Sequence, residues 1–330
     1  MFETRSHAVT TPDGWTLALH HAWDPTRLRA GRRPLLIVPG YGMNSFIFSY
    51  HPRGWSMEGW LVERGFEVFR VDLRAQGDAR FAGPPAQQER FSLEDLALTD
   101  LGASIAATLE HTQGGRDRVD VIGASLGGTF AYAHAALDPA HRIGSIVAIG
   151  SPVRWVSIHP VLAAAFHWPA LVGQMRLRGT RRLAELLLPQ LARFLPWSLS
   201  VYMNPSITEI SAAREMVRTV EDPNRFVNRQ IARWIVDREL RLRRSDGVRV
   251  DVGAALASVD VPLLCVVANG DGIVPIDTAR WPHDVIGSRD RKLLFVGDEE
   301  VRLAHADLFV SNEAHRRVFE PLSRWLEERG

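Results

Sequence analysis

The chain of 330 residues contains a single cysteine, a single lysine and no long uninterrupted apolar run. One cysteine excludes an internal disulfide framework and is typical of a reducing compartment. Because Cys265 lies inside the apolar run 262–268, we expect a buried strand residue there rather than a nucleophile. No stretch of about 18 apolar residues free of charges occurs, so the sequence predicts no transmembrane helix.

The chain also lacks an excess of either charge, because Lys and Arg total 39 against 38 for Asp and Glu. A net charge of +1 gives no reason to expect a nucleic-acid partner. Residues 1–14 contain no apolar segment of the kind found in secretory signals. Together with the single cysteine, this predicts a cytoplasmic protein. The sequence does not indicate an oligomeric state.

Short apolar runs alternate with helical stretches along most of the chain. Continuous apolar runs are typical of parallel strands covered on both faces. The alternation indicates βαβ units and a doubly wound, mostly parallel α/β sheet. Asp13-Gly14 predicts the turn of an N-terminal hairpin. The expected strands are 15–20, 35–39, 67–71, 118–122, 145–149, 262–268 and 292–296, and the expected helices are 55–64, 93–112, 129–138, 278–285 and 312–328.

One interval, residues 152–257, breaks this alternation because it contains no convincing strand. We therefore expect an α/β core formed by residues 1–151 and 258–330, with 152–257 inserted as a helical cap or lid. Residues 151–250 hold 16 Arg against 8 Asp and Glu, together with dense apolar patches. A basic, apolar cap suits acyl chains with anionic groups or weak contact with an anionic membrane surface. The alternative is that the arginines only solvate the outer faces of packed helices.

The segment Gly123-Ala124-Ser125-Leu126-Gly127 matches the pattern G-x-S-x-G. An apolar run precedes it and a helical stretch, 128–136, follows it. A Ser between a strand and a helix, with small neighbours, is typical of a nucleophile elbow, where a strained backbone exposes the hydroxyl. A Gly-flanked Ser also occurs in ordinary turns, so the pattern needs support from elsewhere in the chain.

A Ser nucleophile needs a base, and the base needs an orienting acid. Asp271 follows the expected strand 262–268, and His305 follows 292–296, so the order is Ser, Asp, His. No carboxylate follows the strand 145–149, where Gly150-Ser151 stands, and this favours Asp271 as the acid. The alternatives are an Asx turn or a helix cap for Asp271 and a packed loop histidine for His305.

With these residues placed, the chain resembles the α/β-hydrolase superfamily over essentially its whole length. The matching segments are GASLGG, NGDGIVP, HADLF, PGYG after the third strand, VDLRAQGDAR after the fourth and the early TPDGWTLALHH, which is similar to acid lipases. Polyhydroxyalkanoate synthases share much of the layout but carry Cys at the elbow, where this chain has Ser125. The chain departs from the family in having Pro39-Gly40 where His-Gly is usual, and GASLG in place of GHSxG.

An oxyanion hole requires two backbone N–H donors. One is expected from Leu126, at the N-terminus of the helix after the nucleophile. The resemblance implies that Tyr41 supplies the other. We expect Asp72 and Arg74 to brace the loop after the fourth strand, and Asp307 to cap the last helix. No phosphate-binding glycine motif or zinc-ligand spacing occurs, so we expect neither a cofactor nor a metal.

The sequence thus predicts a serine hydrolase that cleaves a small ester or a lipid-like substrate with an apolar acyl chain. Ser125, Asp271 and His305 are the expected catalytic residues, and Tyr41 and Leu126 the oxyanion donors. The same three residues would also serve amide, peptide or thioester hydrolysis, or acyl transfer to an acceptor other than water. Two further alternatives are a member of the superfamily that only binds a ligand and a lipid-surface protein whose cap is the functional part.

Overall fold

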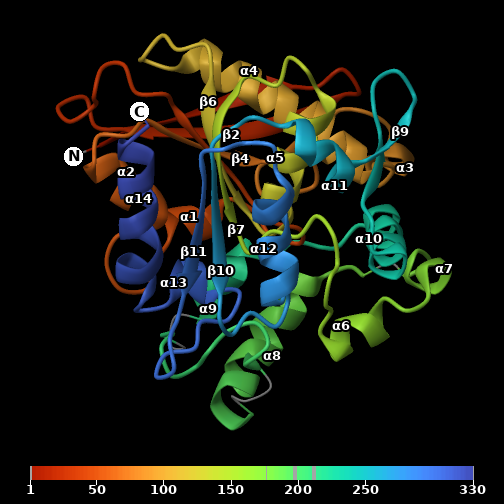
Figure 1. Cartoon of the computed structure of the whole chain (residues 1–330). Coiled ribbons are helices and arrows are strands. Elements are labelled where there is room, and N and C mark those ends of the chain that lie inside the picture. The colour runs from red at the N-terminus through yellow and green to blue at the C-terminus, as the bar shows by residue number, and fades with distance from the viewer. Residues whose placement is uncertain (1, 176, 196–198, 210–212, 330) are drawn as a thin grey trace.

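A nine-stranded mixed sheet organises the chain, which a computed structural model describes at residues 2–175, 177–195, 199–209 and 213–329 (Figure 1). The order is β1-β2-β4-β3-β6-β7-β10-β11, with β5 paired to β2. β2 pairs antiparallel with β1, β4 and β5, and the remaining pairings are parallel. This confirms the expected doubly wound α/β fold. The strands are β1 Glu3–Thr10, β2 Trp15–Trp23, β3 Leu35–Val38, β4 Val68–Asp72, β5 Arg80–Phe81, β6 Val119–Ala124, β7 Ile143–Ile149, β10 Leu263–Ala268 and β11 Arg291–Val296.

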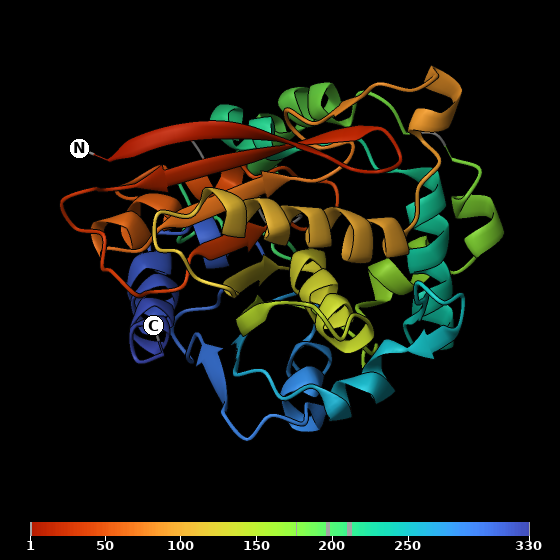
Figure 2. The ribbon, with the colours of Figure 1, turned by 90° about the horizontal axis from the view of Figure 1, so that it is seen from above.

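Helices cover the sheet on both faces (Figure 2). α4 (Leu101–His111), α5 (Leu126–Leu137) and α12 (Ile276–Val285) contribute to one buried apolar cluster. α1 (Phe46–Ser49), α2 (Met57–Glu63), α13 (Asp307–Val310) and α14 (Glu320–Glu327) contribute to a second. The apolar strand runs therefore lie between two layers of helix, as parallel strands require. The remaining helical elements of this part are α3 Pro85–Gln88 and the π-helical turns η1 Asp95–Asp100 and η6 His315–Phe319.

The N-terminal hairpin forms where the Asp13-Gly14 turn predicts it, with Gly14 at φ 90°. The expected strands and helices all occur, with ends shifted by a few residues. β5 is missing from the expectation because it contains only two residues. Cys265 is buried in β10, and burial raises the pKa of its thiol to about 12, which confirms a strand residue rather than a nucleophile.

The chain between β7 and β10 does contain strands, so the expectation of none in 152–257 is wrong. Arg241–Arg243 (β8) and Arg249–Asp251 (β9) form an antiparallel hairpin closed by a turn with Gly247 at φ 84°. Each strand has three residues, too few to show an alternating pattern. The helical elements of this interval are α6 Pro160–Ala165, α7 Pro169–Val172, α8 Thr180–Phe194, α9 Ala213–Met216, η4 Val217–Thr219, α10 Arg225–Asp237, α11 Val252–Ala255 and η5 Leu256–Ser258.

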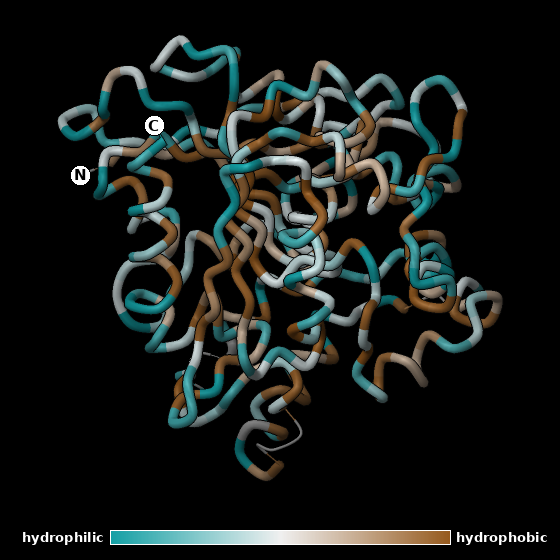
Figure 3. Tube along the Cα trace, in the orientation of Figure 1, coloured by the Kyte–Doolittle hydropathy of each residue, from teal (hydrophilic) through white to brown (hydrophobic). Residues whose placement is uncertain are grey.

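The two ends of this interval differ in burial. α10 and α11 place Val227, Trp234 and Val252 in the same cluster as the strands of the main sheet. Residues 161–195, by contrast, expose many large apolar side chains, and α8 projects from the end of the molecule (Figures 1 and 3). Among the described residues, no helix is both long enough and apolar enough to span a bilayer.

Candidate active site

Ser125 occupies a strained turn between β6 and α5. Its backbone has φ 52° and ψ −122°, a region that residues with a Cβ rarely adopt. The Ser125 N–H donates to the Ile149 carbonyl of β7 at 2.8 Å, which fixes the turn against the next strand. The predicted strand, Ser and helix therefore occur in order, with the geometry of a nucleophile elbow.

The small residues of the motif are required by close backbone contacts. A Cβ at Gly123 would lie 2.3 Å from the Gly128 Cα, and one at Gly127 would lie 2.2 Å from the Val38 carbonyl oxygen. Any larger residue at these positions would push α5 away from the sheet. The sequence pattern G-x-S-x-G is thus explained by packing as well as by the turn.

Asp271 and His305 are hydrogen-bonded to each other although 34 positions separate them. The His305 Nδ1 lies 2.6 Å from Asp271 Oδ2, and both side chains are buried. The other oxygen, Oδ1, accepts the backbone N–H groups of Ile273 and Val274, each at 2.8 Å. The carboxylate therefore makes the Asx-turn contacts and also contacts His305, so the turn is compatible with the predicted role of Asp271 as the orienting acid.

Gly150 lies against the Asp271–His305 pair. A Cβ there would lie 3.1 Å from Asp271 Oδ2 and 3.2 Å from His305 Cε1. Gly150 directly follows Ile149, whose carbonyl holds the Ser125 N–H. Within the part of the chain that the structure describes, no hydrogen bond joins the Ser125 hydroxyl to His305. Such contacts are often long without substrate and shorten when it binds.

Tyr41 lies in the loop after β3, beside the elbow. A Cβ at Gly40 would lie 3.0 Å from the Ser125 Cβ, so the loop passes close to Ser125. The Tyr41 hydroxyl lies 2.8 Å from the Asn224 carbonyl oxygen and 3.0 Å from Asn228 Oδ1, and its single proton is donated between them. Its ring is therefore anchored to the start of α10. Among the described residues, the Tyr41 N–H has no acceptor, and the Leu126 N–H has none outside α5.

Gln76 positions this loop, and the sequence reasoning missed it. Its Nε2 donates to the Gly40 carbonyl at 3.1 Å, and its Oε1 accepts the Leu73 N–H at 3.0 Å. On the other side, the Glu221 N–H donates to the Gly42 carbonyl at 2.9 Å. The sequence signal for Gln76 is the segment VDLRAQGDAR, in which only Asp72 and Arg74 were predicted to have a role.

Asp307 connects the loop after His305 to residues 204–208. Its carboxylate accepts the N–H groups of Ala304 at 2.7 Å and Asn204 at 2.9 Å, and the Thr208 hydroxyl at 2.6 Å. The neighbouring Ala306 N–H donates to the Tyr202 carbonyl at 2.8 Å. Asp307 stands at the first residue of the short helix α13, so the expectation that it caps the last helix is wrong.

One group among the described residues, His20, Asp72 and Asp78, has the spacing of a metal site. Both Asp72 oxygens are already used, since Oδ1 accepts the Ser45 N–H at 2.8 Å and Oδ2 accepts the Asp78 N–H at 3.0 Å. His20 Nε2 also lies 3.2 Å from Oδ2. These contacts fit the predicted bracing role of Asp72 better than a role as a metal ligand.

The bracing by Asp72 predicts a measurable pH dependence of stability. Burial raises the pKa of this carboxyl, but the hydrogen bonds from His20, Asp78 and Ser45 outweigh it and lower the pKa from 3.8 to about 2. A lowered pKa stabilises the fold above the unfolded value, and this contribution, about 2 kcal/mol, is lost as the pH falls from about 5 to about 2. The D72N variant should lack this part of the slope when unfolding is followed in urea across that range.

The matched control for this measurement is D78N. Its side chain is 70% exposed, and only its backbone N–H contacts Asp72. D78N should therefore keep the wild-type slope. Equal slopes for D72N and the wild type would show that Asp72 does not hold the loop in its ionised form.

The profile of the alpha/beta hydrolase fold family matches residues 33–284. The chain belongs to this family. The match covers β3 to α12, including Ser125 and Asp271, while His305 lies beyond its end.

Relatives of this α/β-hydrolase family member include two curated enzymes. The poly(3-hydroxyalkanoate) polymerase subunit PhaC of Haloferax mediterranei is 20% identical over 318 residues, covering 90% of this chain and 59% of that protein. The chain thus spans less than two thirds of that relative. PhaC of Allochromatium vinosum is 23% identical over 322 residues, covering 90% of this chain and 81% of the relative. Among solved structures, a thermophilic esterase from Thermogutta terrifontis superposes with a TM-score of 0.61 at 20% identity, covering 98% of both chains.

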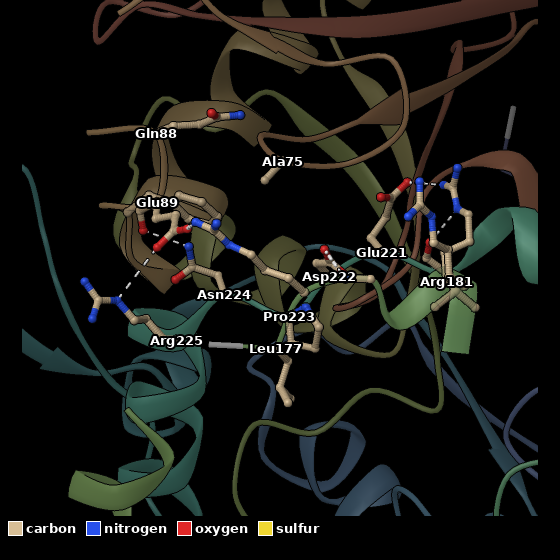
Figure 4. A pocket seen from close by; sticks show the side chains of 15 residues that line it. Ala75, Gln88, Glu89, Leu177, Arg181, Glu221, Asp222, Pro223, Asn224 and Arg225 are labelled. Atoms are coloured by element: carbon tan, nitrogen blue, oxygen red, sulfur yellow. Dashed lines mark hydrogen bonds and ion pairs between the residues drawn. The ribbon is translucent and has the colours of Figure 1, made fainter. Parts of the chain in front are cut away.

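Two cavities of this hydrolase-fold chain adjoin the elements of the site. One, of about 120 Å³, is lined mostly by apolar side chains of α1, α8 and the segment after His305, including Ile47, Leu188 and Ala306. The other, of about 630 Å³, is lined mostly by polar side chains (Figure 4). Figure 4 shows Arg181 and Glu221 on one side of it and Glu89, Asn224 and Arg225 on the other. Neither lining includes Ser125.

Proposed function

We propose that this chain is a serine hydrolase that cleaves a carboxylic ester with an apolar acyl chain. The observation that carries the proposal is the Asp271–His305 hydrogen bond of 2.6 Å, formed beside a Ser125 whose backbone is strained at φ 52°. Nucleophilic acyl transfer requires an acid, a base and a hydroxyl on neighbouring strand ends, and Ser125 is half-buried there. The esterase among the structural neighbours is consistent with this chemistry.

In the proposed reaction, His305 Nε2 accepts the Ser125 proton as the serine oxygen attacks the ester carbonyl. The negative charge on the tetrahedral oxygen is stabilised by the backbone N–H groups of Tyr41 and Leu126. His305 then protonates the departing alcohol, which leaves an acyl group on Ser125. A water molecule, deprotonated by His305, attacks this acyl-enzyme, and the acid is released with Ser125 restored. Asp271 holds His305 in the tautomer that accepts at Nε2.

The apolar cavity supports the proposal of an apolar acyl group. Its lining includes Ala306, which follows His305 directly, and Tyr202, whose ring centroid lies 6.2 Å from that of His305. At about 120 Å³ it is smaller than the roughly 300–1,000 Å³ of pockets that hold drug-sized ligands. We therefore expect ester hydrolysis to favour short acyl chains.

A second candidate is acyl transfer to an acceptor other than water, favoured by the similarity to the PhaC polymerase subunits. The first half-reaction would be the same, and the acyl-enzyme would then be attacked by a hydroxyl group. Adding a primary alcohol to the ester assay separates the two candidates. If the enzyme transfers the acyl group, the alkyl ester should form in larger amount than the free acid. If it is a hydrolase, the product should be mainly the free acid.

The proposed function is tested by labelling with a fluorophosphonate and by a panel of p-nitrophenyl esters of increasing chain length. The wild type should incorporate one label, located by mass spectrometry on Ser125. The S125A variant should lose the label, and its kcat should fall by on the order of 10⁵–10⁶-fold.

S323A is the control for the labelling experiment. Ser323 is buried in α14, where its hydroxyl donates to the Glu320 carbonyl at 2.9 Å. This variant should label and hydrolyse esters like the wild type. Full labelling of S125A would disprove the assignment of the nucleophile.

A further inference from the structure

The outer face of α8 is an apolar stripe open to solvent. Leu183, Leu186, Leu187 and Phe194 are 55%, 71%, 46% and 66% exposed. Their spacing of three, four and eleven positions from the first places them on one side of the helix. Leu195, directly after the helix, is 44% exposed. Large apolar side chains scattered singly are ordinary, but a stripe along one helix marks an interaction surface.

The opposite side of the same helix is also apolar. Ala184 and Leu188 line the cavity of about 120 Å³ that reaches Ala306. A surface helix of a globular protein normally buries one apolar stripe and presents polar residues outward. Packing against the described part of the chain therefore accounts for Ala184 and Leu188 and leaves Leu183, Leu186, Leu187 and Phe194 exposed.

Positive charge borders the stripe. Arg182 and Arg193 are exposed and form no ion pair with any residue that the structure describes, and Glu185 is the only acidic residue of α8. The other arginines at its N-terminal end are already paired, Arg178 with Glu89 at 2.7 Å and Arg181 with Glu221 at 2.9 Å. An apolar face flanked by unpaired arginines is complementary to an anionic lipid surface.

A second copy of the chain is a poorer occupant of this face. A symmetric contact through α8 would bring Arg182 and Arg193 of each copy toward the same residues of the other, so like charges would meet. The helix also projects from the end of the molecule, where it can approach a flat surface (Figures 1 and 3).

We propose that α8 is an interfacial helix that binds the surface of a bilayer containing anionic phospholipid. Leu183, Leu186, Leu187 and Phe194 enter the boundary between headgroups and acyl chains, while Arg182 and Arg193 contact the phosphate groups. The helix lies parallel to the membrane plane, and its inner face keeps the cavity below it closed to water. This binding does not depend on ester hydrolysis, so the two proposals fail or succeed separately.

The test is sedimentation with vesicles of phosphatidylcholine, alone or with about one third phosphatidylglycerol. The wild type should bind the anionic vesicles at least about tenfold more tightly, with the preference falling as salt rises. The R182A/R193A variant should lose about 30-fold in affinity for the anionic vesicles, since each basic residue near such a surface contributes roughly fivefold. The L186D/F194D variant should lose binding to both kinds of vesicle.

F295D is the matched control, because Phe295 is an exposed apolar residue, 50% accessible, on β11. It should bind vesicles like the wild type. Circular dichroism and thermal unfolding establish that each variant is folded before binding is compared. Three results would each overturn the proposal. The first is equal affinity for the two vesicle types, and the second is unchanged binding by L186D/F194D. The third is a wild type that binds neither vesicle and instead forms a dimer that L186D/F194D disrupts.

Discussion

The D271N variant is expected to lower kcat for ester hydrolysis by about 10⁴-fold while the protein remains folded. In the native protein, Asp271 Oδ2 accepts from His305 Nδ1 and Oδ1 accepts two backbone N–H groups. An asparagine can keep its oxygen on the backbone side and its amide toward His305. The amide would then donate to Nδ1, and the histidine would carry its proton on Nε2, where it cannot accept one from Ser125.

Comparing kcat with KM for D271N separates the orientation of His305 from the binding of substrate. Because Asp271 does not line either cavity, KM should change little while kcat falls. D277N serves as the control, since Asp277 is an exposed acid in the first turn of α12. It should retain wild-type kcat. A D271N enzyme within tenfold of the wild type would show that another group orients His305.

The parts of the site that were predictable from the sequence are those encoded by a few consecutive residues. The strand, Ser125 and the helix after it form one local pattern, and the structure reproduces it with the expected strain. Asp271 and His305 could be placed because each follows a strand, and the ends of parallel strands meet at one edge of the sheet. Their hydrogen bond follows from topology rather than from distance along the chain.

The residues that could not be predicted act through contacts with distant backbone groups. Gln76 holds the Gly40 carbonyl, and Asp307 holds the Asn204 N–H, about one hundred positions away. Neither contact produces a motif or a periodic pattern of residues in the sequence. The β8–β9 hairpin was missed for a related reason, because it is short and its arginines hide the strand pattern.

The largest expected loss of stability comes from breaking the ion pair between Arg74 and Asp100. Their side chains are 1% and 0% exposed, and the guanidinium contacts both carboxylate oxygens, with Nη2 2.6 Å from Oδ1 and Nε 2.9 Å from Oδ2. The Arg74 backbone N–H also donates to Asp100 at 3.0 Å. R74M leaves the buried Asp100 carboxylate without its cation, so this variant is expected to lower the free energy of unfolding by about 3–5 kcal/mol. Urea denaturation measures this loss.

A double-mutant cycle distinguishes the cost of an orphaned charge from a general loss of packing. The R74M/D100L protein removes both charges, so it should be more stable than R74M, whereas D100L leaves Arg74 its second partner, Asp13, at 2.7 Å. Strictly additive losses would instead mean that the two side chains act through separate contacts.

The pair also affects the site, because Arg74 precedes Ala75, at φ 60°, and Gln76, which holds the loop of Tyr41. We therefore expect R74M to lose kcat even where it remains folded. The double variant should recover part of this kcat, because it carries no orphaned charge beside the segment that holds Gln76.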